Sequence, residues 1–118
     1  MRLKKGFEEA VLEEIFGAPA LRQYPNERWL VSYSEYSKTF GDHSIKFVLL
    51  PASGEFEFSL FVADKEVLNM TSAHQTGSYA EIKDGKGFLI LKDEESEYVT
   101  TIRLIPDLFI GQTLGPDT

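Results

Sequence analysis

The sequence predicts an α+β protein in which one N-terminal helix packs on a strongly curved, mostly antiparallel sheet. Three observations lead to this prediction. Apolar residues recur every four positions near the N-terminus, apolar and polar residues alternate over most of the remaining chain, and short turn sequences separate the alternating runs. With 118 residues, the chain is expected to form one domain, residues 1–118, because two domains would each lack enough chain for a core.

The helix is expected at about residues 5–17. Phe7, Val11 and Ile15 are four residues apart and therefore share one face of a helix. Gly17 is a typical helix end, because glycine readily adopts the left-handed conformation that follows a last turn. A helix with one apolar face is expected to cover the concave side of the sheet.

About six to seven strands are expected after the helix. The clearest is E-F-E-F-S-L-F-V-A, where Phe56 and Phe58 point to one side and Glu55 and Glu57 to the other. Such alternation is typical of an antiparallel sheet with one face on a core and one in water. The expected strands are residues 28–38, 44–50, 55–63, 66–71, 79–83, 87–92 and 97–105.

Short turns join most of these strands. Asp84-Gly85 is a strong hairpin signal, because a type I′ turn needs positive φ at both central residues. Hairpins make sequence neighbours spatial neighbours, so we expect one meander, either an open bent sheet or a half-closed barrel. Pro106 has no N–H and should end the last strand, leaving residues 106–118 as a tail whose apolar side chains pack back on the body or belong to a contact surface.

The net charge of −7 is distributed unevenly along the chain. Residues 55–118 hold twelve acids and five bases, whereas residues 1–54 hold seven of each. A surface of this sign repels phosphate groups and anionic lipid, so the sequence argues against nucleic-acid and membrane binding and favours a basic protein partner. The chain has no cysteine, and its basic start lacks the apolar stretch of a signal peptide, which predicts a cytoplasmic protein.

Residues 71–78 form the one expected connection that is longer than a hairpin turn, and they are rich in hydroxyl groups. His74, Ser72 and Thr76 are therefore a candidate loop site. A Ser–His pair needs a third group to orient the imidazole, and no such group follows at a recognisable spacing. A hydrogen-bonded polar loop is the favoured interpretation. Two histidines without cysteine are a poor ligand set, so neither a metal nor another cofactor is expected.

The most acidic stretch is D-E-E-S-E, residues 93–97. It is either a solvated hairpin tip that blocks edge pairing or a surface that attracts a basic partner. Tyrosines on strands would be suitable anchors, since protein interfaces are enriched in them; these are Tyr33, Tyr36, Tyr79 and Tyr98. The predicted partner-binding residues are Asp93, Glu94, Glu95, Glu97, Tyr98 and Tyr79.

These observations favour a binding protein over an enzyme. The first hypothesis is a small acidic inhibitor or immunity-type protein that blocks a basic partner, such as a nuclease or toxin, by electrostatic complementarity. The alternative is a small-ligand-binding or enzymatic cup formed by the curved sheet, with residues 71–78 at its rim. A third is a homo-oligomer that uses a sheet edge or the apolar tail. The cup would be lined by Phe47, Phe56, Phe58, Phe61 and Phe88.

Overall fold

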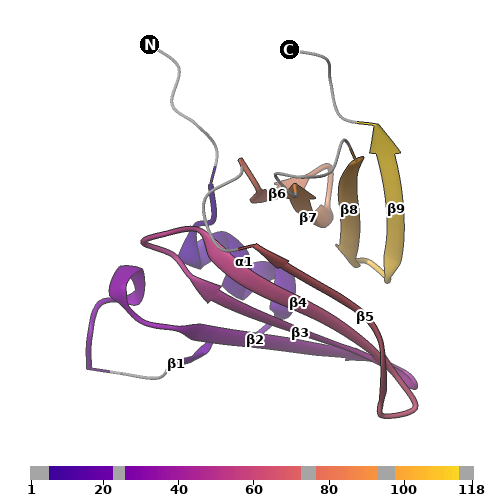
Figure 1. Cartoon of the computed structure of the whole chain (residues 1–118), viewed down its shortest axis with the longest axis horizontal. Helices are drawn as coiled ribbons and strands as arrows, with labels where there is room; N and C mark the ends of the chain where they lie inside the picture. Colours follow the sequence, from indigo (N-terminus) through magenta and orange to yellow (C-terminus); the bar gives the residue numbers. More distant parts are fainter. Residues whose placement is uncertain (1–5, 23–25, 73–76, 93–97, 115–118) are drawn as a thin grey trace.

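The computed structural model of this protein describes residues 6–22, 26–72, 77–92 and 98–114. Within these ranges the chain forms an α-helix, a 3-10 helix and nine strands in two antiparallel sheets (Figure 1), so the predicted α+β class is confirmed. In chain order the elements are α1 (Glu9–Phe16), β1 (Leu21–Arg22), η1 (Trp29–Val31), β2 (Ser34–Phe40), β3 (His43–Leu50), β4 (Glu55–Val62), β5 (Lys65–Ser72), β6 (Tyr79–Lys83), β7 (Lys86–Lys92), β8 (Tyr98–Ile105) and β9 (Phe109–Leu114).

The strands form two sheets, where the sequence predicts one. β1 to β5 follow one another in a five-stranded sheet, and β6 to β9 do the same in a four-stranded sheet. Each sheet is a meander, but the chain leaves the first sheet after Ser72 instead of pairing β6 with β5. The prediction of a single meander is therefore wrong, and the sheets do not close into a barrel. The long connection that the sequence does identify is the point at which the chain changes sheet.

The helix ends where the sequence predicts but begins at Glu9, later than predicted, so Phe7 precedes it. Gly17 has a left-handed φ of 78°, and its N–H donates to the carbonyl oxygen of Glu13 at 2.8 Å. The buried side of α1 is formed by Leu12, Ile15 and Phe16. α1 contacts β2 of the first sheet and β6 and β8 of the second, so it joins the two sheets (Figure 1).

Alternate residues of both sheets and the buried side of α1 form one core. The rings of Phe16 and Phe47 are nearly parallel, with centroids 6.3 Å apart, and Phe7 lies 5.3 Å from Phe47. Burial of each such large apolar side chain stabilises the fold by about 1.5–3 kcal/mol. The buried apolar residues are Leu12, Ile15, Phe16, Tyr36, Ile45, Phe47, Leu49, Phe56, Phe58, Ala80, Leu89, Leu91, Ile102 and Leu104.

The turn chemistry read from the sequence is confirmed between β6 and β7. Asp84 and Gly85 have φ values of 54° and 76°, the pair of positive angles that a type I′ turn requires. Ala63 and Asp64 adopt the same kind of conformation between β4 and β5, with φ values of 50° and 67°. These turns match the twist of the strands they join, and they fix the register of each hairpin.

The predicted strand 28–38 is only partly correct. Its first part is η1, a single 3-10 turn, and the strand begins at Ser34. The indole N–H of Trp29 donates to the hydroxyl oxygen of Tyr36 at 2.8 Å. A tryptophan that is partly buried needs a partner for its N–H, and the 3-10 turn brings the indole back over β2 to reach one.

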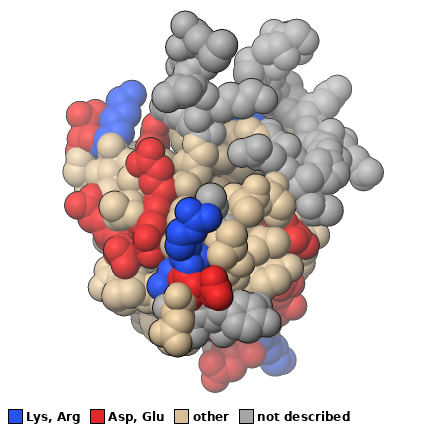
Figure 2. Space-filling view, turned by 90° about the vertical axis from the view of Figure 1, so that its left-hand side faces the viewer, with Lys and Arg blue, Asp and Glu red and all other residues tan. Residues whose placement is uncertain are grey.

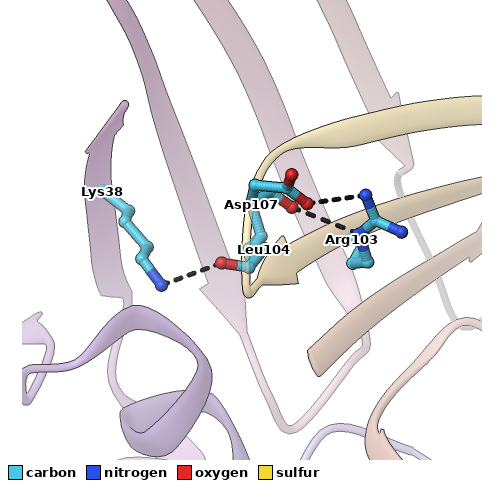
Figure 3. Close-up of polar contacts among 4 residues, drawn as sticks. All are labelled: Lys38, Arg103, Leu104 and Asp107. Carbon is cyan, nitrogen blue, oxygen red and sulfur yellow. Dashed lines mark hydrogen bonds and ion pairs between the residues drawn. The ribbon is translucent and has the colours of Figure 1, made fainter. Parts of the chain in front are cut away.

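The predicted tail 106–118 is also corrected. Residues Phe109–Leu114 form β9, which pairs with β8 along its whole length. At the connecting turn, Arg103 Nη2 lies 2.6 Å from Asp107 Oδ1, and Arg103 Nε donates to the carbonyl of Asp107 at 3.3 Å (Figure 3). The open edge of β8 offers unpaired backbone groups, and a segment rich in apolar residues pairs with such an edge.

Lys38 connects three elements through backbone groups. Its ammonium on β2 donates to the carbonyl of Ile15 at 3.0 Å and to the carbonyl of Leu104 at 2.9 Å (Figure 3 shows the second contact). Ile15 lies in the last turn of α1, where carbonyls lack partners within the helix. Burial lowers the pKa of Lys38 below its usual value of 10.5. The contacts hold α1 and the two sheets together at one point.

Candidate functional site

The outer face of the five-stranded sheet carries the side chains that alternate along each strand with those of the core. In the middle of this face, Val48 on β3 pairs with Glu35 on β2 and with Glu57 on β4. Side chains opposite one another on neighbouring strands have Cβ atoms about 5 Å apart. The register therefore places a carboxylate on each side of an apolar residue.

Two open hollows lie side by side on this face. The larger one has a volume of about 400 Å³, and its border consists of Tyr33, Val48, Glu55, Phe56, Glu57, Thr71 and Ser72. The smaller one has a volume of about 280 Å³, and its border consists of Leu21, Arg22, Tyr33, Glu35 and Val48. Tyr33 and Val48 border both hollows, so their side chains form the wall between them.

Neutral donors orient the carboxylates beside the larger hollow. The hydroxyl of Tyr33 donates to Glu55 Oε2 at 3.4 Å. The side-chain amide of Asn69 on β5 donates to Glu57 Oε2 at 2.9 Å and to Glu66 Oε1 at 3.1 Å. Because a phenol and an amide carry no charge, these bonds position the carboxylates and leave their negative charges uncompensated.

Within the described ranges, Glu35 has a cationic neighbour on this face, Lys46. Its Oε1 atom lies 3.4 Å from Lys46 Nζ, and the two side chains are 38% and 48% exposed. An ion pair so open to water contributes about 0–1 kcal/mol and opens easily. The pair leaves the charges of Glu55 and Glu57 unchanged, and these two residues are therefore the anionic part of the site.

The fold redistributes the acidic excess that the sequence places in residues 55–118. β4 and β5 belong to the first sheet, so Glu55, Glu57 and Glu66 join Glu35 there. Acidic side chains also gather on one side of the face drawn in Figure 2, with basic side chains among them. The second sheet with its turns, over the described residues of 79–114, holds three acids and four bases: Glu81, Asp84, Asp107, Lys83, Lys86, Lys92 and Arg103.

Three of the predicted site residues, Ser72, Tyr79 and Tyr98, lie within the described ranges. Ser72 ends β5, is 8% exposed and borders the larger hollow. Tyr79 begins β6 and Tyr98, which is 52% exposed, begins β8, with β7 between these two strands. The remaining predicted residues lie outside the described ranges: Asp93, Glu94, Glu95, Glu97, His74 and Thr76.

The phenylalanines predicted to line the alternative cup lie in different parts of the fold. Phe47, Phe56 and Phe58 are at most 4% exposed and pack in the core. Phe88 lies in the second sheet, and Phe61 pairs with Ser44 on β3. The larger hollow does reach Thr71 and Ser72, at the start of the predicted rim, but it opens on the outer face of the sheet, and Phe56 is the one predicted lining residue at its border.

The described residues give little support for other classes of site. No three His, Asp or Glu side chains within the described ranges converge as a metal site. His43, which the structure does describe, has its Nδ1 atom 2.9 Å from Asp42 Oδ1 in a hairpin turn. None of the helices in the described part of the chain is long and apolar enough to cross a membrane.

Sequence reasoning identified the pieces of this face but not their assembly. The alternation of β4 correctly assigned Glu55 and Glu57 to the solvent side, and Tyr33 was one of four candidate anchors. What was missed is that Tyr33, Val48 and the two glutamates meet. Their proximity depends on the pairing register of β3 with β4 and on the η1 turn before Tyr33, neither of which has a local sequence signal.

Comparison with known proteins gives a likeness of fold. No family model matches this chain, and no curated protein does. A similar chain occurs in a solved structure described as a contact-dependent growth inhibition toxin–immunity protein complex from Klebsiella pneumoniae 342. The TM-score is 0.64 with 12% sequence identity, over 95% of this chain and 98% of that chain. At this identity, the two chains share a fold.

Proposed function

We propose that this chain is an immunity-type protein that binds a toxin and blocks it. The observation that carries the proposal is the likeness in fold, over 95% of this chain, to a chain of a toxin–immunity complex. The net charge of −7 favours the immunity role within such a pair. A toxin that acts on nucleic acid must attract phosphate groups, whereas a chain of this charge repels them and attracts a basic protein.

The proposed mechanism needs no reactive side chain. An acidic inhibitor is drawn to a basic toxin by long-range attraction, which raises association rates by about 10–10³-fold and weakens as salt rises. Once bound, it covers the surface that the toxin uses on its substrate. We place this encounter in the cytoplasm. Contacts from the acidic run Asp93, Glu94, Glu95 and Glu97, with Tyr79 and Tyr98, remain part of the proposal.

A growth-rescue selection tests this function. Fragments of the source genome are expressed from an inducible promoter in two bacterial strains, one of which also expresses this chain. We expect at least one fragment that stops growth in the first strain and is tolerated in the second. Its purified product should form a complex with this chain, measured by titration calorimetry, with an affinity that falls as salt is raised.

The control for the selection is a strain that expresses a variant of this chain unable to fold, so that rescue requires the native structure. If every toxic fragment remained toxic in the presence of this chain, the immunity proposal would be wrong. Rescue without a direct complex would also contradict it, because the proposed mechanism is occupation of the toxin surface.

A further inference from the structure

We propose that the outer face of the five-stranded sheet is the docking surface for the partner, and that the larger hollow receives a lysine or arginine side chain between Tyr33 and the Glu55–Glu57 pair. The inference rests on the proposed function and adds to it the face and the chemistry of the contact. The occupant to which it commits is a basic protein surface with at least one protruding cationic side chain.

Several apolar side chains on this face are exposed to solvent. Leu21 is 73% exposed, Val67 is 57% exposed and Tyr33 is 41% exposed. With Val48 in the wall between the hollows, they give a surface of apolar and aromatic groups rimmed by charged residues. Interfaces have this composition: a tyrosine that fills or borders a pocket, with a polar rim around it.

Charge decides which partner fits. Glu55 and Glu57 stand two residues apart on β4 and on the same face, so their Cα atoms are about 7 Å apart. Their hydrogen-bond donors, Tyr33 and Asn69, are neutral, so the two like charges stay close together. A guanidinium or ammonium group between them removes this repulsion, and the exposed ring of Tyr33 provides a second favourable contact for a cation.

The outer face of the four-stranded sheet does not offer the same chemistry. There Arg103 pairs with Asp107 at 2.6 Å and lies 5.4 Å from the centroid of the Phe109 ring. That face therefore already contains its own cation over its exposed aromatic ring. Lys83 and Lys86 lie near Glu81 and Asp84, so the described residues of this sheet have no acidic excess that would attract a basic partner.

A titration with a tetra-lysine peptide, followed by backbone amide NMR at low salt, tests the site without the partner. We expect the largest shifts at Tyr33, Val48, Glu55 and Glu57, and we expect them to disappear in the Glu55→Gln/Glu57→Gln variant. The control variant Asp64→Asn/Asp84→Asn removes the same charge from two hairpin turns where asparagine fits the positive φ, and it should keep the shifts. Shifts confined to other residues, or none, would overturn the assignment of a cation site.

Association kinetics with the partner recovered by the growth selection test the docking face. Glu55→Gln/Glu57→Gln should lower the association rate constant at low salt by about tenfold, and Asp64→Asn/Asp84→Asn by less than about twofold. If only neutralisation of Asp93, Glu94, Glu95 and Glu97 slowed association, the docking face would be wrong and the immunity function would stand. If the selection itself yielded no rescue, the function would fail, and the peptide titration alone would decide the cation site.

Discussion

Replacing Lys38 by methionine tests whether one ammonium group holds α1 and the two sheets together. Methionine keeps most of the volume of the lysine stem but cannot donate to Ile15 O and Leu104 O, which now receive hydrogen bonds at 3.0 and 2.9 Å. Hydrogen bonds from charged donors contribute about 1.5–3 kcal/mol each. Part of this is offset, because the variant no longer has to desolvate an ammonium group. We expect a net loss of about 1.5–3 kcal/mol in the free energy of unfolding.

The assay is urea denaturation followed by the fluorescence of Trp29, the single tryptophan of the chain. With a slope of about 1.5 kcal/mol/M, the expected loss moves the midpoint down by about 1–2 M. Lys46→Met is the matched control, because the ion pair of Lys46 with Glu35 is exposed to water, and it should change stability by less than about 0.5 kcal/mol. Equal midpoints for Lys38→Met and wild type would refute the role given to Lys38.

Three further predictions concern the same packed region. Burial raises the pKa of Tyr36 from 10.0 to about 12, with Glu9 and Glu13 adding to the shift, so the folded state holds this proton more tightly than the unfolded state. About 2–3 kcal/mol of stability should therefore be lost between pH 10 and pH 12, and urea midpoints across this range should show that Tyr36→Phe lacks the loss. The lowered pKa of Lys38 has the opposite effect, because the folded state releases this proton more readily than the unfolded state. The free energy of unfolding should therefore rise as pH rises toward 10.5, and this rise should be absent in Lys38→Met. Gly87→Ala should cost about 1–3 kcal/mol by the same measurement, because its new Cβ would lie 2.9 Å from Ile15 Cγ1; an unchanged midpoint would show that α1 moves away freely.

Local signals in the sequence were sufficient for most individual elements. The alternation in E-F-E-F-S-L-F-V-A depends only on the two-residue period of a strand, and β4 follows it with Phe56 and Phe58 inside. Gly17 and the Asp84-Gly85 turn depend on the freedom of single residues at positive φ, and both are in place. Features of this kind are fixed by residues next to one another in the chain, and a sequence displays them directly.

Pairing between distant segments could not be read in the same way. Whether β6 would pair with β5 or start a new sheet depends on what the core gains from two sheets and α1 together, which a local sequence pattern does not display. The same is true of β9, whose apolar residues suggested packing but whose partner, the edge of β8, is a property of the assembled sheet. Gly87 illustrates the difference: its sequence D-G-K-G indicates a turn, while the structure shows that it also makes room for Ile15 of α1.

The candidate site also depends on pairing between distant segments, and this pairing decides where its charges lie. In the sequence, the acidic excess belongs to the second half of the chain, with residues 93–97 as its densest part. In the fold, β4 carries Glu55 and Glu57 into the first sheet, where Glu57 lies opposite Val48 and the hydroxyl of Tyr33 donates to Glu55. Charge dispersed on a surface raises the rate at which any basic molecule arrives, but it does not select one. A pair of carboxylates fixed by a sheet beside an aromatic ring can also discriminate, because a partner must place its cation at one position in order to gain from both.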